Sequence, residues 1–163
     1  MNFLGFNLKI RGFNRVGVKL NGKSLGYSYN SRVDVGAKLQ AYLMTGSNLG
    51  SLSSPNYPIY IALSTSSLTP AHGDTTLTGE TSVTGLGRAI GTPQNYVAPA
   101  SLDAAASVDV YKQFTLTGTA TTIVSSALFD ASSTGNMFCE ANLATSATMQ
   151  TNDILQLTWT INF

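Results

Sequence analysis

The closing segment of the chain, residues 155–163, constrains the fold more than any other stretch. Its odd positions, Leu155, Leu157, Trp159, Ile161 and Phe163, are all apolar, and its even positions are all polar. Because successive side chains of a β-strand point to opposite faces, this alternation predicts a strand with one buried and one solvated face. Such a strand belongs to an antiparallel sheet that covers a core on one side.

Shorter candidate strands with the same period of two precede it at residues 59–63, 108–116, 123–129 and 137–143. The 163 residues have the length of one domain, and only 10% of them are charged, which disfavours a charge-rich helical bundle. Several short strands separated by turns predict a mainly β protein, an antiparallel β-sandwich with a jelly-roll-like arrangement.

A β-hairpin is predicted near the N-terminus, where Asn21-Gly22 separates two alternating runs. Asn-Gly supplies the two positive φ angles that a two-residue type I′ turn requires. One face of this hairpin is expected to be apolar and the other basic. The pairs that the turn predicts are Leu20 with Lys23, Lys19 with Ser24, Val18 with Leu25, Val16 with Tyr27 and Arg15 with Ser28.

One helix is predicted over residues 32–44. Ser31 can cap it, and Val35, Leu39 and Leu43 repeat at helical spacing. Gly36 weakens the helix by about 1 kcal/mol relative to alanine, so the helix is expected to need a sheet to dock on.

Charge is unevenly distributed along the chain. Up to residue 45 there are seven Lys or Arg residues and one Asp, whereas residues 46–163 contain two cations and seven carboxylates. Segments of opposite sign attract within a subunit or between neighbours. We divide the chain into a basic N-terminal hairpin or arm, residues 1–30, and a β-sandwich domain, residues 31–163, that includes the helix. The residues expected to bind a partner protein are Lys9, Arg11, Arg15, Lys19 and Lys23.

The sequence lacks the residues of standard catalytic and metal sites. His72 is the single histidine and Cys139 the single cysteine, so paired imidazoles and an internal disulfide are excluded. No Gly-x-Ser-x-Gly motif occurs, and the third glycine of Gly85-Leu86-Gly87-Arg88-Ala89-Ile90-Gly91 lies one place too late for a dinucleotide fingerprint. We therefore expect no enzymatic activity, no cofactor and no metal.

Four residues are expected to have structural roles. Asp74 and Glu80 are two loop carboxylates, too few for a calcium loop, and the alternatives for Glu80 are a partly exposed ion pair with Arg88 or simple solvation. Trp159 is expected to lie in the core because it shares the apolar face of the closing strand.

Nucleic acid and membranes are not expected as partners. The basic segment interleaves Phe6, Phe13, Tyr27 and Tyr29 with cations, but the cations are sparse and one face of the hairpin is apolar. No run of eighteen apolar residues occurs, and the first six residues lack the charged head and long apolar run of a signal peptide. The mature chain is expected to be soluble and unexported.

Short motifs along most of the chain resemble those of small structural proteins of tailed-phage virions. The matching stretches are Val33 to Leu43, Tyr60 to Thr65, Leu68 to Glu80, Gly87 to Ala89, Phe114 to Gly118, Ser126 to Ala131, Gly135 to Phe138 and Gln150 to Phe163. Asp74 and Glu80 match the loop carboxylates of that family, and Arg88 matches its strand arginine. The resemblance implies a β-sandwich component of a head or tail that carries no catalytic residue.

The function expected from these features is that of a phage head decoration protein, located in the virion and assembled in the host cytoplasm. Its basic N-terminal segment would attach to the major capsid protein or another virion protein. Loops within residues 64–106 would project or contact the next copy of a homo-oligomer, such as a trimer.

Two alternatives remain open at this point. One is a tail, neck or fibre component with the same fold. The other is a module that binds carbohydrate or a host surface, with Tyr57, Tyr60 or Tyr96 as stacking platforms.

Overall fold

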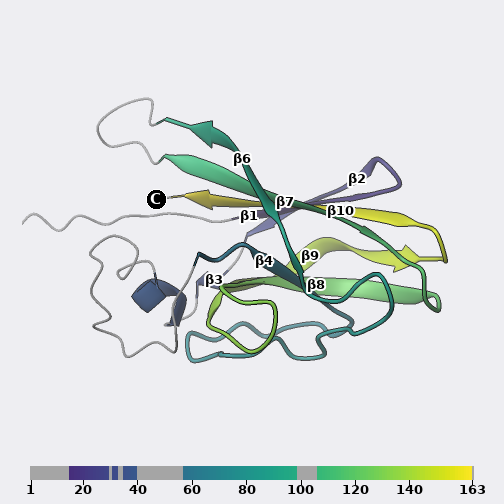
Figure 1. Ribbon diagram of the computed structural model, residues 1–163, viewed down its shortest axis with the longest axis horizontal. Helices are drawn as coiled ribbons and strands as arrows, with labels where there is room; N and C mark the ends of the chain where they lie inside the picture. Colours follow the sequence, from purple (N-terminus) through teal and green to yellow (C-terminus); the bar gives the residue numbers. More distant parts are fainter. Residues whose placement is uncertain (1–14, 30, 33–34, 40–56, 99–105, 163) are drawn as a thin grey trace, which may run out of the picture.

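The computed structural model describes residues 15–29, 31–32, 35–39, 57–98 and 106–162. These residues form two five-stranded antiparallel sheets that face each other, which makes the protein a β-sandwich as predicted (Figure 1). A jelly-roll-like strand order stays a prediction. The first sheet has the order β2(Lys23–Tyr29), β1(Arg15–Leu20), β10(Ile154–Asn162), β7(Ser107–Thr115), β6(Thr92–Val97). The second has the order β3(Ser31–Arg32), β9(Met137–Met149), β8(Thr121–Phe129), β4(Tyr60–Ser64), β5(Ala89–Ile90).

Strand β10 confirms the predicted closing strand and lies at the centre of the first sheet, between β1 and β7. Leu155, Leu157 and Trp159 are completely buried and belong to the main apolar cluster between the sheets. Trp159 also donates its indole Nε1 to the hydroxyl of Ser126 on β8 at 3.2 Å. The largest side chain of the core therefore joins the two sheets by packing and by a hydrogen bond.

The Asn-Gly turn is confirmed, because Asn21 and Gly22 have φ angles of 47° and 79°. The pairs of Leu20 with Lys23 and of Lys19 with Ser24 are confirmed as well. Beyond them the predicted register is wrong, since a β-bulge follows between Lys19 and Val18.

The bulge changes which hairpin residues face the core. Val18 lies opposite Gly26, whose φ is 101°, and Val16 lies opposite Ser28. An extra residue on one strand reverses the side on which all later residues emerge. Tyr27 therefore pairs with Gly17 and is 62% exposed on the outer face of the sheet, not on the apolar face where the sequence predicts it.

The hairpin is an integral part of the first sheet. Strand β1 pairs with β10 over its whole length, and Val16 and Val18 are buried in the main cluster. Of the predicted arm, residues 1–14 lie outside the described residues. The domain division at residue 30 is a sequence prediction, and the described part of that segment, residues 15–29, consists of β1 and β2.

The predicted helix begins later than residue 32. Ser31 and Arg32 form β3, which pairs with β9, and the described helical residues are 35–39. Residues 40–44 lie outside the described part. The expected docking is confirmed, because Leu39 is completely buried and a Cβ added to Gly36 would lie 1.8 Å from the carbonyl oxygen of Phe138. Glycine is thus required where this turn meets β9.

The second sheet is covered on both faces. Its inner face packs on the first sheet, and on its outer face Ala62, Ala127, Phe129 and Met137 form a smaller apolar cluster with Leu77 of the β4–β5 loop. This loop, residues 65–88, runs along the outside of the second sheet in Figure 1. The expectation that the loop projects is therefore wrong for Leu77, which is buried.

Strand β6 occupies part of a segment, residues 91–106, that the sequence indicates is a loop. Pro93, Gln94 and Asn95 suggest a turn, yet Thr92–Val97 pairs with β7 at the edge of the first sheet. Proline is tolerated at an edge because its missing N–H is not needed there. All residues of β6 are exposed.

Replacing Trp159 by alanine is expected to lower the free energy of unfolding by about 3–5 kcal/mol, because the substitution leaves a large cavity between the sheets. Denaturant unfolding followed by circular dichroism measures the change. The Ile90→Ala variant is the control, since Ile90 is 53% exposed, and its change should stay within about 0.5 kcal/mol. A loss below about 1 kcal/mol for Trp159→Ala would contradict the central role of this side chain.

Candidate functional site

A groove of about 230 Å³ crosses the outer face of the first sheet. Its lining comes from all five strands of that sheet and from both ends of the chain. Hydroxyl, amide and aromatic side chains predominate, together with two cations and one carboxylate. The lining residues are Arg15, Gly17, Val18, Lys19, Ser24, Tyr27, Gln94, Asn95, Asp109, Tyr111, Gln156, Thr158 and Thr160.

Strand register explains why the sheet is hollow at this point. Along one row across the sheet, Tyr27 pairs with Gly17, Gly17 with Thr158, and Thr158 with Tyr111. Neighbouring strands lie about 4.8 Å apart, so the two tyrosines, separated by two intervening strands, have backbones about 14 Å apart. Gly17 leaves room for the ring of Tyr27 above it, and Thr158 forms the floor between this ring and Tyr111.

The ring of Tyr27 is held in place by what lies beneath and beside it. A Cβ at Gly17 would lie 2.6 Å from Cε1 of Tyr27, so the ring rests directly over the glycine backbone. The guanidinium of Arg15 lies 5.0 Å from the centroid of the same ring, within cation–π distance. The aromatic wall on the β2 side therefore has a defined orientation although it is largely exposed.

A polar network lines one end of the groove. Asp109 accepts a hydrogen bond from the hydroxyl of Thr160 at 2.8 Å and one from the amide of Asn95 at 3.2 Å. Nε of Arg15 reaches the hydroxyl of Thr160 at 3.4 Å. Both carboxylate oxygens of Asp109 are thus used within the protein. Among the described residues, neither Arg15 nor Lys19 has an ion-pair partner.

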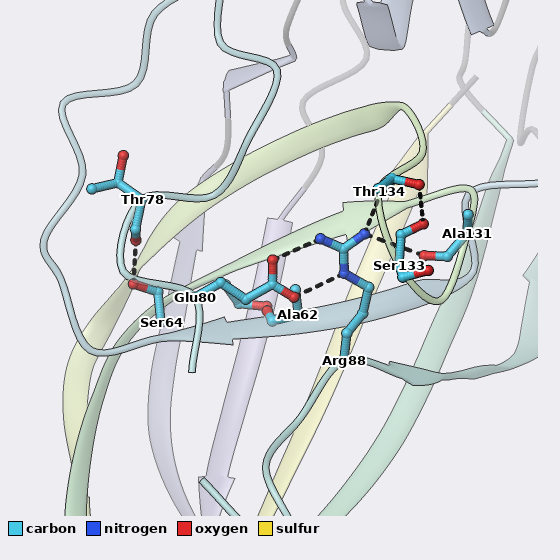
Figure 2. A network of polar contacts seen from close by, with 9 residues as sticks. Ala62, Ser64, Thr78, Glu80, Arg88, Ala131, Ser133 and Thr134 are labelled. Atoms are coloured by element: carbon cyan, nitrogen blue, oxygen red, sulfur yellow. Dashed lines mark hydrogen bonds and ion pairs between the residues drawn. The ribbon is translucent and has the colours of Figure 1, made fainter. Parts of the chain in front are cut away.

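Arg88 and Glu80 form a second polar cluster, shown in Figure 2, on the other sheet. Nε and Nη2 of Arg88 donate to the two carboxylate oxygens of Glu80 at 2.9 and 2.6 Å. Nη1 donates to the carbonyls of Thr134 at 2.7 Å and Ala131 at 3.3 Å, in the β8–β9 turn. The guanidinium also lies 3.5 Å from the centroid of the Phe129 ring.

This cluster has a structural role. The Arg88 side chain is only 9% exposed, and its hydrogen bonds connect the β4–β5 loop to the β8–β9 turn. A planar guanidinium can make a bidentate contact and two further bonds at once, which lysine cannot. The predicted alternative of a Glu80–Arg88 pair is therefore what the structure contains. Within the described ranges, no group of three or more His, Cys, Asp or Glu residues could hold a metal ion.

Asp74 lies beside a buried carboxyl group on β9. The pKa of Glu140 is raised from 4.5 to about 7, first by burial and then by a hydrogen bond with Asp74 and repulsion from its charge. The pKa of Asp74 is lowered, first by the backbone N–H of Ala71, which donates at 2.7 Å, and then by Glu140. Below about pH 7, Glu140 is thus the protonated member of the pair. Its Oε1 has no hydrogen-bond partner among the described residues.

The predicted partner-binding residues are placed as follows. Arg15 and Lys19 line the groove, Lys23 is exposed beside the hairpin turn, and Lys9 and Arg11 lie outside the described residues. The groove also contains residues that the sequence analysis does not single out, such as Tyr111, Asp109 and Thr158. Each of them alternates with apolar residues of its own strand, which places it on the solvated face. Only strand pairing shows that they are neighbours.

The predicted stacking platforms are arranged differently. Tyr57 and Tyr96 are 66% and 63% exposed, and neither lines the groove. Tyr60 is partly buried against the smaller apolar cluster.

The sandwich has the Arg88–Glu80 cluster on one sheet and a polar groove on the other. These features define a strand-built structural or binding module. The comparison with protein families identifies it more closely: the model of the podophage GP4 fiber I protein gp80 family matches residues 37–160. The chain belongs to this family and is a phage virion structural component. Neither the comparison with curated proteins nor that with solved structures gave a match. Among the described residues, no helix is long and apolar enough to cross a membrane.

The Arg88→Lys variant is expected to lose about 1–3 kcal/mol of the free energy of unfolding, because lysine cannot keep both the bidentate bond and the two carbonyl bonds. Thermal or denaturant unfolding measures this loss. Arg15→Lys is the matched control, since Arg15 makes one long bond to Thr160 and a cation–π contact that lysine can also make, and it should change stability by less than about 0.5 kcal/mol. Equal effects of the two variants would contradict the structural role of the Arg88 hydrogen bonds.

The raised pKa of Glu140 predicts a stability that depends on pH. Folding favours the protonated carboxyl, so this contribution is fully present below pH 4.5 and is lost as pH rises to about 7. Glu140→Gln keeps a donor and cannot ionise. The wild type should therefore lose, relative to this variant, on the order of 1–3 kcal/mol between pH 4.5 and 8.

Unfolding measured by denaturant at several pH values tests this expectation. The Asp153→Asn variant is the control, because the pKa of Asp153 is lowered and its titration lies below this pH window. It should keep the slope of the wild type. A wild type and a Glu140→Gln variant with the same pH profile would contradict the assignment.

Proposed function

We propose that this protein is a component of a phage fibre and not a decoration protein of the head lattice. The observation that carries the proposal is the match of residues 37–160 to a fibre-protein family. The match covers β4 to β9, most of β10 and the Arg88 cluster, and it leaves β1, β2 and β3 outside. Membership of a family of structural fibre proteins also supports a non-enzymatic role.

The edge of the sandwich supports a role in assembly. Ile90, Tyr96 and Val97 are all more than half exposed and lie on one short stretch of chain that passes from β5 to β6. Each strand is at the edge of its sheet, where unpaired backbone groups and apolar side chains are available to another molecule. We propose that this edge contacts other virion proteins or further copies of the chain in a homo-oligomer.

The basic N-terminal segment provides positive charge for contacts with other virion proteins. Lys23 lies on the β1–β2 hairpin outside the groove, and Lys9 and Arg11 precede the hairpin in the chain. Electrostatic attraction to an acidic partner increases the rate and the specificity of association. The partner proposed for this segment is a neighbouring virion protein.

Purified virions labelled with a gold-conjugated antibody against this protein test the location. We expect the label at the fibres, and antibody absorbed beforehand with the purified protein serves as the control. Label distributed over the head surface would overturn the fibre assignment and support the head decoration protein expected from the sequence.

A further inference from the structure

We propose that the groove on the first sheet binds a polysaccharide chain that contains acidic sugars. The inference rests on the proposed function, because a groove that recognises a surface glycan has a use on a fibre. It goes further by naming the site, the residues and the chemical class of the ligand.

The two tyrosine side chains provide the apolar contacts that a sugar ring needs. The C–H bonds on one side of a pyranose are apolar and weakly positive, which suits the negative face of an aromatic ring. Tyr27 and Tyr111 lie on the same row of the sheet, on either side of Gly17 and Thr158. The Tyr27 ring lies over Gly17, two strand spacings or about 10 Å from the backbone of Tyr111, so the tyrosines can contact different sugar residues of one extended chain.

Polar side chains between and around the tyrosines match sugar hydroxyls. Gln94, Asn95 and Gln156 carry amides, which donate and accept, and Ser24 and Thr158 carry hydroxyls. A ligand with many hydroxyl groups can form hydrogen bonds with these side chains, whereas an apolar ligand would leave them without partners.

The charges favour a ligand with carboxylates. Asp109 accepts hydrogen bonds from Thr160 and Asn95, and its single negative charge is outweighed by Arg15 and Lys19 in the groove lining. Arg15 and Lys19 have no ion-pair partner among the described residues, and they lie on β1 on either side of Gly17. Charge-assisted hydrogen bonds from these cations to sugar carboxylates would be the strongest polar contacts of the complex.

Nucleic acid fits the groove less well. A polynucleotide carries a phosphate on every residue, and proteins that bind it without sequence preference follow the backbone with many cations. This groove offers two cations and holds one carboxylate.

Affinity gel electrophoresis of the purified full-length protein tests the inference. The embedded probes are four carboxylated polysaccharides, polygalacturonate, alginate, hyaluronate and polysialic acid, with neutral dextran and single-stranded DNA as comparisons. We expect at least one carboxylated polysaccharide to retard the wild type. Retardation by none of them, or equally by dextran, would overturn the inference, as would retardation by DNA alone.

Variants of the two walls and of the cations locate the binding. Tyr27→Ala and Tyr111→Ala should each weaken binding about tenfold or more, as expected for a central aromatic contact. Lys19→Gln should weaken binding to the carboxylated probe more than binding to its carboxyl-reduced form. Tyr96→Ala is the matched control, because Tyr96 is as exposed as Tyr27 but does not line the groove.

Circular dichroism and thermal unfolding establish that each variant is folded. Should Tyr111→Ala fail to fold, Tyr27→Ala and Gly17→Ala still decide the question, because alanine at 17 would displace the Tyr27 ring. Unchanged binding by the folded groove variants, or a loss with Tyr96→Ala alone, would overturn the inference. If the antibody labels the fibres but the protein binds no polysaccharide, only this inference is overturned. If the protein binds polysaccharide but the antibody labels the head, only the proposed function is overturned.

Discussion

Burial of one face of β10 between the two sheets is the interaction on which the rest of the structure depends. The strand lies at the centre of the first sheet, so its inner side chains contact the second sheet and its outer side chains become the middle of the solvated face. Trp159 adds a hydrogen bond to Ser126 across the interior. Because strand side chains alternate, burial of Leu157 and Trp159 places Thr158 on the groove floor.

The two outer faces of the sandwich have different uses. The second sheet is covered by the β4–β5 loop, whose Leu77 packs on Phe129, and Arg88 fastens this loop to the β8–β9 turn. A long loop in a small domain is often a binding surface, but here it completes an apolar cluster. The first sheet has a groove on its outer face. The outer face of the second sheet is therefore covered by its own loop, and the outer face of the first sheet carries the candidate binding groove.

Pairing across strands decides the chemical character of the groove. The polar residues of β1, β10 and β7 come from distant parts of the chain, and the sheet brings them into rows. The Arg15–Thr160–Asp109 row forms a hydrogen-bonded network, in which Arg15 donates to Thr160 and Thr160 donates to the carboxylate of Asp109. The next row contains glycine and threonine between two tyrosines, which gives the groove its depth. A shift of one residue in β1 or β10 would exchange their side chains in the groove for apolar ones.

Residues with strong local signals were predictable from the sequence. The alternation of residues 155–163 determined a two-faced strand, and Asn21-Gly22 determined a tight hairpin turn, because both depend on backbone geometry over a few residues. The Arg88–Glu80 pair was one of the alternatives that the sequence allowed for these nearby residues. The start of the helix was not, since pairing with β9 holds Arg32 in a strand.

Other features were decided by the tertiary structure alone. The bulge beside Val18 places Tyr27 outside, over Gly17, whereas a regular hairpin would have buried it. Gly36, which weakens a helix in isolation, is the residue that lets this turn approach the Phe138 carbonyl. The groove depends on which strands become neighbours, and that choice is set by the burial of side chains far apart in the chain. Local sequence thus determined the strands and the turn, while long-range packing determined their register and the faces that they present.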